Sequence, residues 1–460
     1  MLDLLRAVLL GLASGLLLFA AARRAWLGWL ALAPLCAAVY LSAPLAAGAA
    51  ALVFGVLAYA PMYWGRFSFI PHFTLMVVTL NAVTWGLASA VAALIWPNGS
   101  PAWGALIFPV LVVMAAMPGE RGGGRLGNVL LVSQEGWLPA VHIAALGHDL
   151  IVDASLALSA AVPAMLLVQL PPSGATVASA AAAAGLVAGA VAFGTARYRA
   201  NVRQVGRAPR VRVAAVSVDG DDLPGPVTGP AYRDVEGTIA RYEPYMAQAF
   251  AQGARLVVLP EVAVTVRGEA RTRWLDGLAR WAAQGHATVV AGLLDEDLPG
   301  NQLAIADERG AIAAVYDKQH PVRGAEPPRC SKMPPALVTN DGTPVSAIIC
   351  FDIDHNDLVG PIARAGGLLA VPTNDWRNFT EIHHRAAVWE AVATGVAVIR
   401  SAGHGVSSIY DAAGRVIARA SSFDGPVVLV ADVPVAVAAG RALPVGEAES
   451  STEREALKAA

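Results

Sequence analysis

The chain of 460 residues is 56% hydrophobic, has a mean hydropathy of +0.53 and carries a formal net charge of −2. Ordinary soluble domains are roughly 45 to 50% apolar, so this excess indicates membrane-spanning segments. The small net charge gives no indication of nucleic-acid binding. Three cysteines (Cys36, Cys330 and Cys350) do not make a disulfide framework, and we expect no bridge between Cys330 and Cys350.

The charged side chains are concentrated in the second half of the chain, because residues 1–196 hold only eleven of the 68. A helix that crosses a bilayer needs roughly 20 mostly apolar residues. The first candidate is expected to stay in the mature protein rather than act as a cleaved signal peptide, since further candidates follow at once. We predict seven spans, give or take one, with an additional half-helix at 137–147; the candidates are 4–21, 25–43, 46–64, 70–96, 102–117, 148–170 and 175–196.

Between these spans lies a glycine-rich stretch, GERGGGRLG at 119–127. It lacks the Lys-Ser/Thr ending of a phosphate-binding loop, so we interpret it as a flexible connector. The overall division predicted is a transmembrane domain at 1–200, a catalytic domain at 201–440 and a polar tail at 441–460.

From Arg210 onward, short apolar runs alternate with amphipathic stretches, which is typical of a sheet covered by helices in the α/β class. Residues 405–421 read as strand, Asp-Ala-Ala-Gly turn and strand, a hairpin. The predicted helices are 233–253, 270–284 and 379–394, and the predicted strands are 211–218, 255–260, 287–294, 311–318, 345–350 and 368–375.

Three reactive residues stand at the carboxyl ends of predicted strands, where α/β sheets gather their chemistry: Glu261, Lys318 and Cys350. Lys318 is one of only three lysines among 33 basic residues, which indicates that a compact titratable amine is needed there. If the three converge, Glu261 can act as general base and Cys350 as nucleophile, while Lys318 stabilises an oxyanion. An ordinary salt bridge between Glu261 and Lys318 is the alternative.

The acidic run after Cys350 does not fit a calcium site, since an EF-hand loop starting at Asp352 needs Gly and Glu where Asp357 and Ala363 stand. Nor do we expect another metal, because the histidines are scattered, and the neighbours His383 and His384 cannot share one helix face. The predicted chemistry therefore needs no metal and no cofactor.

The segments LPE (259–261), YDKQH (316–320) and ICFD (349–352) resemble, in the same order, those of the nitrilase superfamily. A multi-span half precedes these segments, and with this arrangement most of the chain resembles the apolipoprotein N-acyltransferase family. That resemblance implies a four-layer αββα sandwich with a Glu-Lys-Cys triad. It also implies a supporting role for Glu326, and it assigns 398–417 to an arginine-serine strand followed by a hairpin.

The resemblance further implies the reaction. Cys350 would take a fatty acyl group from a phospholipid as a thioester and pass it to the amino-terminal α-amine of a lipid-modified lipoprotein. The protein would be a monomer in the bacterial cytoplasmic membrane, with the catalytic domain outside the cytoplasm. Positive charges oppose that orientation, because basic residues near span ends usually face the cytoplasm; only Arg6 would do so here, against Arg23, Arg24, Arg66, Arg121, Arg125, Arg197, Arg199 and Arg203.

Several positions depart from the family pattern. Phe351 and Asp352 stand where an aromatic residue and Glu are usual, and Asp352 either accepts a hydrogen bond from backbone near the nucleophile or caps the next helix. The loop that begins at 373 is shorter than the family's substrate lid. Asn374 and Trp376 are its candidate substrate contacts, with turn capping and core packing as the alternatives, and we assign no catalytic role to His404.

The altered loop, together with a tail that contains no apolar span, leaves two other functions open. One is a membrane-tethered amidase that hydrolyses a small carbon-nitrogen substrate, with water taking the acyl group. The other is a non-catalytic membrane receptor, against which the presence of Glu261, Lys318 and Cys350 argues.

Overall fold

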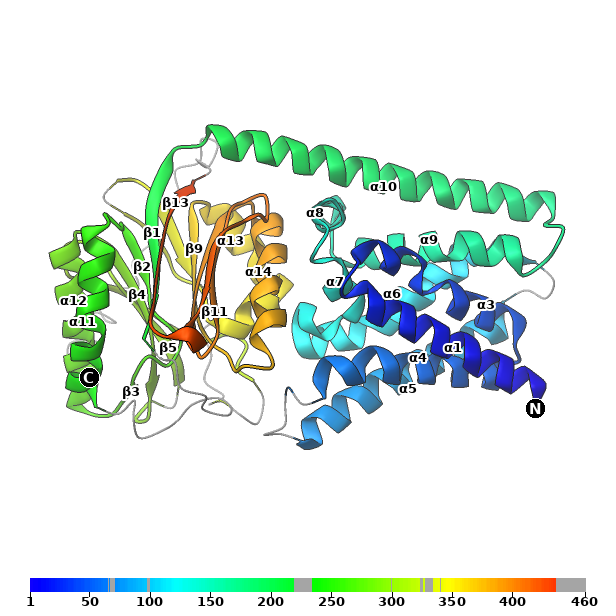
Figure 1. Cartoon of the computed structure of the whole chain (residues 1–460), viewed down its shortest axis with the longest axis horizontal. Coiled ribbons are helices and arrows are strands. Elements are labelled where there is room, and N and C mark those ends of the chain that lie inside the picture. Colours follow the sequence, from blue (N-terminus) through cyan, green and yellow to red (C-terminus); the bar gives the residue numbers. More distant parts are fainter. Residues whose placement is uncertain are drawn as a thin grey trace, which may run out of the picture.

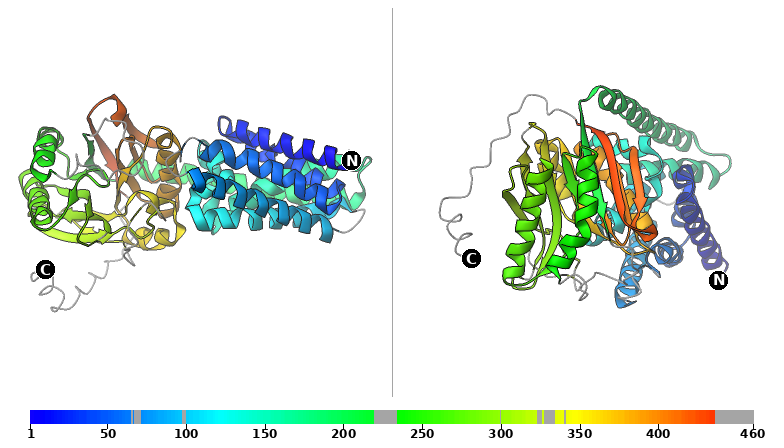
Figure 2. Two further views of the ribbon diagram at one scale, coloured as in Figure 1. Left: turned by 90° about the horizontal axis from the view of Figure 1, so that it is seen from below. Right: turned by 60° about the vertical axis from the view of Figure 1, so that its left-hand side comes forward.

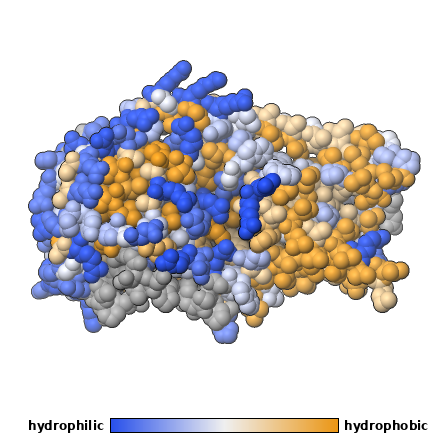
Figure 3. Space-filling view, in the orientation of Figure 1, coloured by the Kyte–Doolittle hydropathy of each residue, from blue (hydrophilic) through white to orange (hydrophobic). Residues whose placement is uncertain are grey.

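The computed structural model describes residues 1–64, 66, 71–96, 100–218, 234–298, 300–322, 326, 334–339 and 341–435. The predicted polar tail and Cys330 lie outside these residues. The chain forms a helical half and an α/β half placed end to end (Figure 2, left). The surface of the helical half is largely apolar, whereas that of the α/β half is mostly polar (Figure 3).

Six helices in the described residues are long and apolar enough to cross a membrane, which agrees with the predicted seven within its tolerance of one. They approach each other closely through small residues, as membrane helices do. A Cβ atom on Gly11 would lie 2.1 Å from Ala50 O, and one on Gly55 would lie 2.6 Å from Ala82 Cα. The six are α1 (Leu2–Ala21), α4 (Pro44–Tyr63), α5 (Pro71–Ile95), α6 (Gly104–Gly123), α9 (Leu150–Leu167) and α10 (Gly174–Arg207).

The span predicted at 25–43 corresponds to an apolar helical segment, Ala25–Leu41, that is shorter than the six. This segment is broken into η1 (Ala25–Leu27), α2 (Gly28–Ala31) and α3 (Ala33–Leu41). Pro34 lies in the first turn of α3 and cannot continue a helix from α2, and the N–H of Leu35 is donated to Ser14 Oγ instead (2.8 Å). The segment still returns the chain to the end where α1 begins, because the N–H of Ala43 is donated to Asp3 Oδ2 (3.1 Å).

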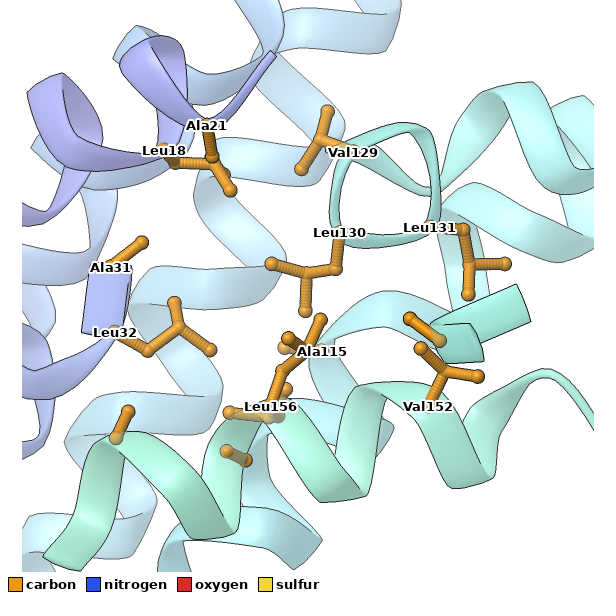
Figure 4. Close-up of a cluster of buried hydrophobic side chains, with 14 of the residues drawn as sticks. Leu18, Ala21, Ala31, Leu32, Ala115, Val129, Leu130, Leu131, Val152 and Leu156 are labelled. Carbon is orange, nitrogen blue, oxygen red and sulfur yellow. The ribbon is translucent and has the colours of Figure 1, made fainter. Parts of the chain in front are cut away.

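Short helices fill the end of the bundle that faces the α/β half: η3 (Gly124–Gly127), α7 (Val129–Gln134), α8 (Leu138–Val141) and η4 (His142–Leu146). The last two coincide with the half-helix predicted at 137–147. Leucine and valine side chains of α7 pack against α1, α6 and α9 in the buried cluster of Figure 4.

The interpretation of 119–127 as a flexible connector is also wrong. These residues complete α6 and form η3, and Gly124 adopts a φ of +57°, where only glycine is unstrained. A Cβ atom there would lie 2.5 Å from Asp354 O in the α/β half. The stretch is therefore a close contact between the two halves.

The α/β half is the predicted αββα sandwich. In Figure 1, α11 (Val235–Ala251) and α12 (Glu269–Gly285) cover one sheet, while α13 (Val359–Ala365) and α14 (Thr380–Thr394) cover the other and face the helical bundle. The strand order of the first sheet is β13-β1-β2-β4-β5-β6, with β3 paired to β4, and that of the second is β12-β11-β10-β9-β8-β7.

The six predicted strands are present, although the strand expected at 345–350 ends earlier, at Ala347, and Cys350 begins the 3-10 helix η6 (Cys350–Asp354). The predicted hairpin and the strand before it are also present. The strands are β1 (Arg210–Ser217), β2 (Leu256–Val258), β3 (Thr265–Val266), β4 (Thr288–Asp295), β5 (Gly300–Ala306), β6 (Ile312–Asp317), β7 (Ala336–Val338), β8 (Pro344–Ala347), β9 (Leu368–Asn374), β10 (Ala397–Gly403), β11 (Val406–Tyr410), β12 (Val416–Ser421) and β13 (Val427–Pro434).

The two halves share one apolar core. Ile143 and Leu156 of the bundle belong to the same buried cluster as Trp389 and Val392 of α14. Polar contacts add to it, including one of 3.2 Å between His142 Nε2 and Ala413 O. The helical half is thus packed directly against the layer that lies next to η6 and Cys350.

Candidate active site

Glu261 lies just beyond the end of β2, on a strained stretch of backbone. The next residue, Val262, has a φ of +48°, which is an outlier for a β-branched residue. Gly292 of the neighbouring β4 makes the close approach possible, because a Cβ atom there would lie 2.5 Å from Glu261 Cα. Such strain is often found where a side chain must be aimed at a site.

Lys318 directly follows β6 and is fully buried between two carboxylates. Its Nζ donates to Glu261 Oε1 (2.8 Å) and to Glu326 Oε1 (2.7 Å). Asn301 of β5 donates to the same two oxygens, at 2.7 and 3.1 Å. Burial alone would lower the pKa of Lys318, but Glu261 and Glu326 raise it well above its usual value, so the amine is charged.

Cys350 begins η6 with a φ of +48° and is 7% exposed. Its Sγ lies 3.9 Å from the carbonyl oxygen of Asn374, and the N–H of Asn374 donates to Glu261 Oε2 (2.8 Å). One residue at the end of β9 therefore joins the thiol to the carboxylate. Burial and the charge of Glu261 raise the pKa of the thiol, against the opposing effect of Lys318, so Cys350 rests as a neutral thiol.

Asp352 accepts hydrogen bonds from the backbone N–H next to Cys350, the first of its two predicted roles, and also from the loop after Lys318. The N–H groups of Ile349 (3.1 Å) and His320 (2.7 Å) and the hydroxyl of Tyr316 (2.9 Å) all donate to its carboxylate. Because His320 lies two residues after Lys318, Asp352 ties the lysine loop to η6. Glu326 likewise closes its own loop by accepting from the N–H of Val322 (2.7 Å).

The two candidate substrate contacts lie in different surroundings. The side-chain oxygen of Asn374 lies 3.1 Å from Nδ1 of His404, whose φ of +50° marks another strained position near the site. Trp376 stacks on Phe379 with ring centroids 4.5 Å apart, and its indole donates to the carbonyl oxygen of Arg66 in the helical half. This packing corresponds to the structural alternative stated for Trp376.

A buried group of charges next to Cys350 was not predicted. Asp375, His383 and Arg400 are each at most 1% exposed. Arg400 donates to Asp375 Oδ2 (2.6 Å) and to Val406 O (2.7 Å), and Nδ1 of His383 lies 2.7 Å from Asp375 Oδ1. An arginine inside the apolar run VAVIRSAG was the signal that could have indicated a buried ion pair.

Two groups in the described residues bring possible metal donors within 4.8 Å of one another. The first consists of His320, His355 and Asp357 on the surface side of η6, where the two imidazole rings stack. The second consists of Cys350, Asp375 and His383. In the second group Asp375 already pairs with His383 and Arg400, and Cys350 rests as a neutral thiol, so we interpret the two charged members as part of an ion-pair network.

Known proteins resemble parts of this chain. The carbon-nitrogen hydrolase family model matches residues 212–441. A curated relative, the apolipoprotein N-acyltransferase of Sinorhizobium medicae (strain WSM419), is 29% identical over 31% of this chain and 34% of the relative. The matched part thus spans about a third of that relative's length.

Similar solved structures include the NitN amidase of Nesterenkonia sp. AN1, with 23% identity, a TM-score of 0.42, and coverage of 49% of this chain and 93% of that one. A second structure of an amidase from Nesterenkonia sp. has 23% identity and a TM-score of 0.40, covering 50% of this chain and 92% of that one. Because the family model spans half of the sequence, the chain belongs to the carbon-nitrogen hydrolase family.

Proposed function

We propose that the protein is a membrane acyltransferase that moves a fatty acyl group from a phospholipid, through a thioester on Cys350, to the amino-terminal α-amine of a diacylglyceryl lipoprotein. The observation that carries this proposal is the arrangement around Glu261. One of its oxygens accepts from Lys318, and the other accepts from the N–H of Asn374, whose carbonyl contacts the thiol of Cys350.

In the first half-reaction, Glu261 takes the proton of the Cys350 thiol as the sulfur attacks the ester carbonyl of the phospholipid. The Lys318 ammonium stabilises the oxyanion that forms. Collapse of this intermediate breaks the ester bond, and the proton returns from Glu261 to the oxygen of the departing lysophospholipid. The product on the enzyme is an acyl thioester.

In the second half-reaction, the α-amine of the acceptor attacks the thioester, and Glu261 removes a proton from the amine. The carbon-sulfur bond breaks, the new amide leaves, and the proton returns to Cys350. Lys318 stabilises the second oxyanion as it did the first. Glu326 and Asn301 keep the lysine and glutamate aligned through both steps.

The apolar helices support a substrate that reaches the site from a bilayer. The amino-terminus and the α/β half lie at opposite ends of the bundle (Figure 1). We propose that the α/β half lies outside the cytoplasm and that the exposed arginines at its end of the bundle, Arg121 among them, bind phospholipid phosphates. A reporter fused after Ala460 tests this placement, and an active cytoplasmic reporter would contradict it.

The central experiment is to incubate the purified full chain in detergent with a phospholipid of defined acyl chain and to measure the mass of the Cys350 peptide. We expect the acyl mass on that peptide, none in Cys350→Ala, and an unchanged yield in Cys36→Ala, since Cys36 is buried in α3. No acyl mass on the wild-type peptide would rule the proposal out. Release of ammonia from simple amides without phospholipid would instead favour the amidase alternative.

A further inference from the structure

Two backbone segments determine the position of Cys350: one contains it, and the other contacts its thiol. One is η6, which Cys350 begins and Asp354 ends. The other is the end of β9, where Asn374 contacts both the thiol of Cys350 (3.9 Å) and Glu261 (2.8 Å) and is followed directly by Asp375. Each segment thus carries one aspartate: Asp354 ends η6, and Asp375 directly follows Asn374.

His383 lies between these two aspartates. On α14, its Nδ1 is 2.7 Å from Asp375 Oδ1 and its Nε2 is 3.3 Å from Asp354 Oδ2. Asp375 has Arg400 as a second partner, but in the described residues neither oxygen of Asp354 has a hydrogen-bond partner. His383 is therefore the nearest compensating charge for Asp354, a carboxylate with no exposed surface.

One imidazole compensates two carboxylates only when both ring nitrogens carry a proton, because the neutral ring has a single N–H. Burial alone would lower the pKa of His383, but Asp375 and Asp354 raise it. The bridge is kept at neutral pH and is lost as the pH rises through the raised pKa of His383; at low pH it is lost through protonation of Asp354, whose pKa is raised by burial. Arg400 on β10 lies 3.0 Å from His383 Nδ1 and opposes its charge. The other charged or titratable groups around the bridge are Arg125 and Glu135 in the helical half, and Cys350 itself.

We infer that His383 is a positioning residue of the nucleophile: its imidazolium ties η6 to the end of β9 and so holds the Cys350 sulfur in line with the Glu261 carboxylate. It contacts neither substrate in the proposed reaction. The inference rests on the proposed role of Cys350 as nucleophile. It concerns the thiol alone, so it can be tested without any acyl donor.

The test is the rate of alkylation of Cys350 by iodoacetamide in the full chain in detergent, measured as the mass of the Cys350 peptide across a pH series. In His383→Gln we expect a rate roughly 10- to 100-fold below wild type at neutral pH, as for a misplaced reacting group. The wild-type profile should also contain an alkaline inflection, from loss of the bridge, that is missing in the variant.

His384→Gln is the matched control, because His384 is the adjacent buried histidine and contacts Tyr410 instead (3.0 Å). Burial and Arg400 lower its pKa to about 3, so it is uncharged in this pH range. We expect His384→Gln to reproduce the wild-type rate and profile. A wild-type rate and profile in His383→Gln would overturn the inference.

If His383→Gln does not fold, Asp354→Asn carries the test, since it removes the charge at the far end of the bridge and keeps the shape. We expect the same loss of rate and of the alkaline inflection, and little additional loss in the double variant, because both changes open one bridge. An Asp354→Asn profile like wild type would equally overturn the inference. Failure of acyl transfer with these alkylation results intact would count against the proposed function only.

Discussion

Replacing Arg125 by methionine should lower the free energy of unfolding of the protein, because Arg125 connects the two halves. Arg125 is 1% exposed and makes four contacts from η3. Two are ion pairs, with Asp149 in the helical half (2.7 Å) and Glu390 of α14 (2.8 Å). The other two reach the segment that follows Cys350, at Ile353 O (3.1 Å) and Asn356 Oδ1 (2.5 Å).

Methionine would leave Asp149 and Glu390 buried without their cation, and such a loss destabilises a protein by about 3–5 kcal/mol, or roughly 10²- to 10⁴-fold in the folding equilibrium. Part of this cost is relieved by protonation of Glu390, because burial already raises its pKa to about 7 even beside Arg125. The full effect is therefore expected at pH 8, where Glu390 is ionised in the native protein, and a smaller one at pH 6.

The assay is denaturant unfolding of the full chain in detergent, followed by tryptophan fluorescence at both pH values. Arg121→Met is the matched control, because Arg121 is an exposed arginine one turn earlier on α6. The double variant Arg125→Met with Glu390→Gln should recover part of the loss at pH 8. A destabilisation below about 1 kcal/mol at pH 8, equal to that of Arg121→Met, would refute the reasoning about this buried network.

Three further outcomes are expected. Gly292→Ala should destabilise the protein by roughly 1–3 kcal/mol and slow Cys350 alkylation, because its Cβ atom would collide with the backbone of Glu261; Gly206→Ala, which faces open space on α10, should do neither. Asp352→Asn should slow alkylation about 10-fold, since an amide cannot accept from donors on both sides, and a wild-type rate would contradict this. Tyr316→Phe removes one donor to Asp352 and should have the smaller effect of the two in the same assay.

Much of the fold could be predicted from the chain because local patterns carry it. Long apolar runs predict helices that cross a membrane, and alternating apolar and amphipathic stretches predict a sheet covered by helices. The span predicted at 25–43 is shorter and interrupted in the structure, because Pro34 lies in the first turn of α3 and hydropathy alone does not reveal such a break. The strand before Cys350 was drawn too long, since composition alone does not reveal that the chain turns sharply with a positive φ at the cysteine.

The candidate site divides in the same way. Glu261, Lys318 and Cys350 could be selected by residue type and by their positions at strand ends, and the structure brings Glu261 and Lys318 into direct contact while Asn374 links Glu261 to Cys350. Arg125 and His383 could not be identified as important from residue type and position along the chain. The acidic partners of Arg125 lie 24 and 265 residues away along the chain.

The sequence by itself determined which segments are apolar, which residues are chemically reactive and where along each strand they stand, because these properties depend on neighbours within a few positions. Only the tertiary structure decided that a glycine-rich stretch makes a close contact between the two halves and that one histidine lies between aspartates of two different segments. The physical reason is burial. A charge removed from water needs a compensating partner, and the tertiary fold, not the neighbouring sequence, decides which residue that is.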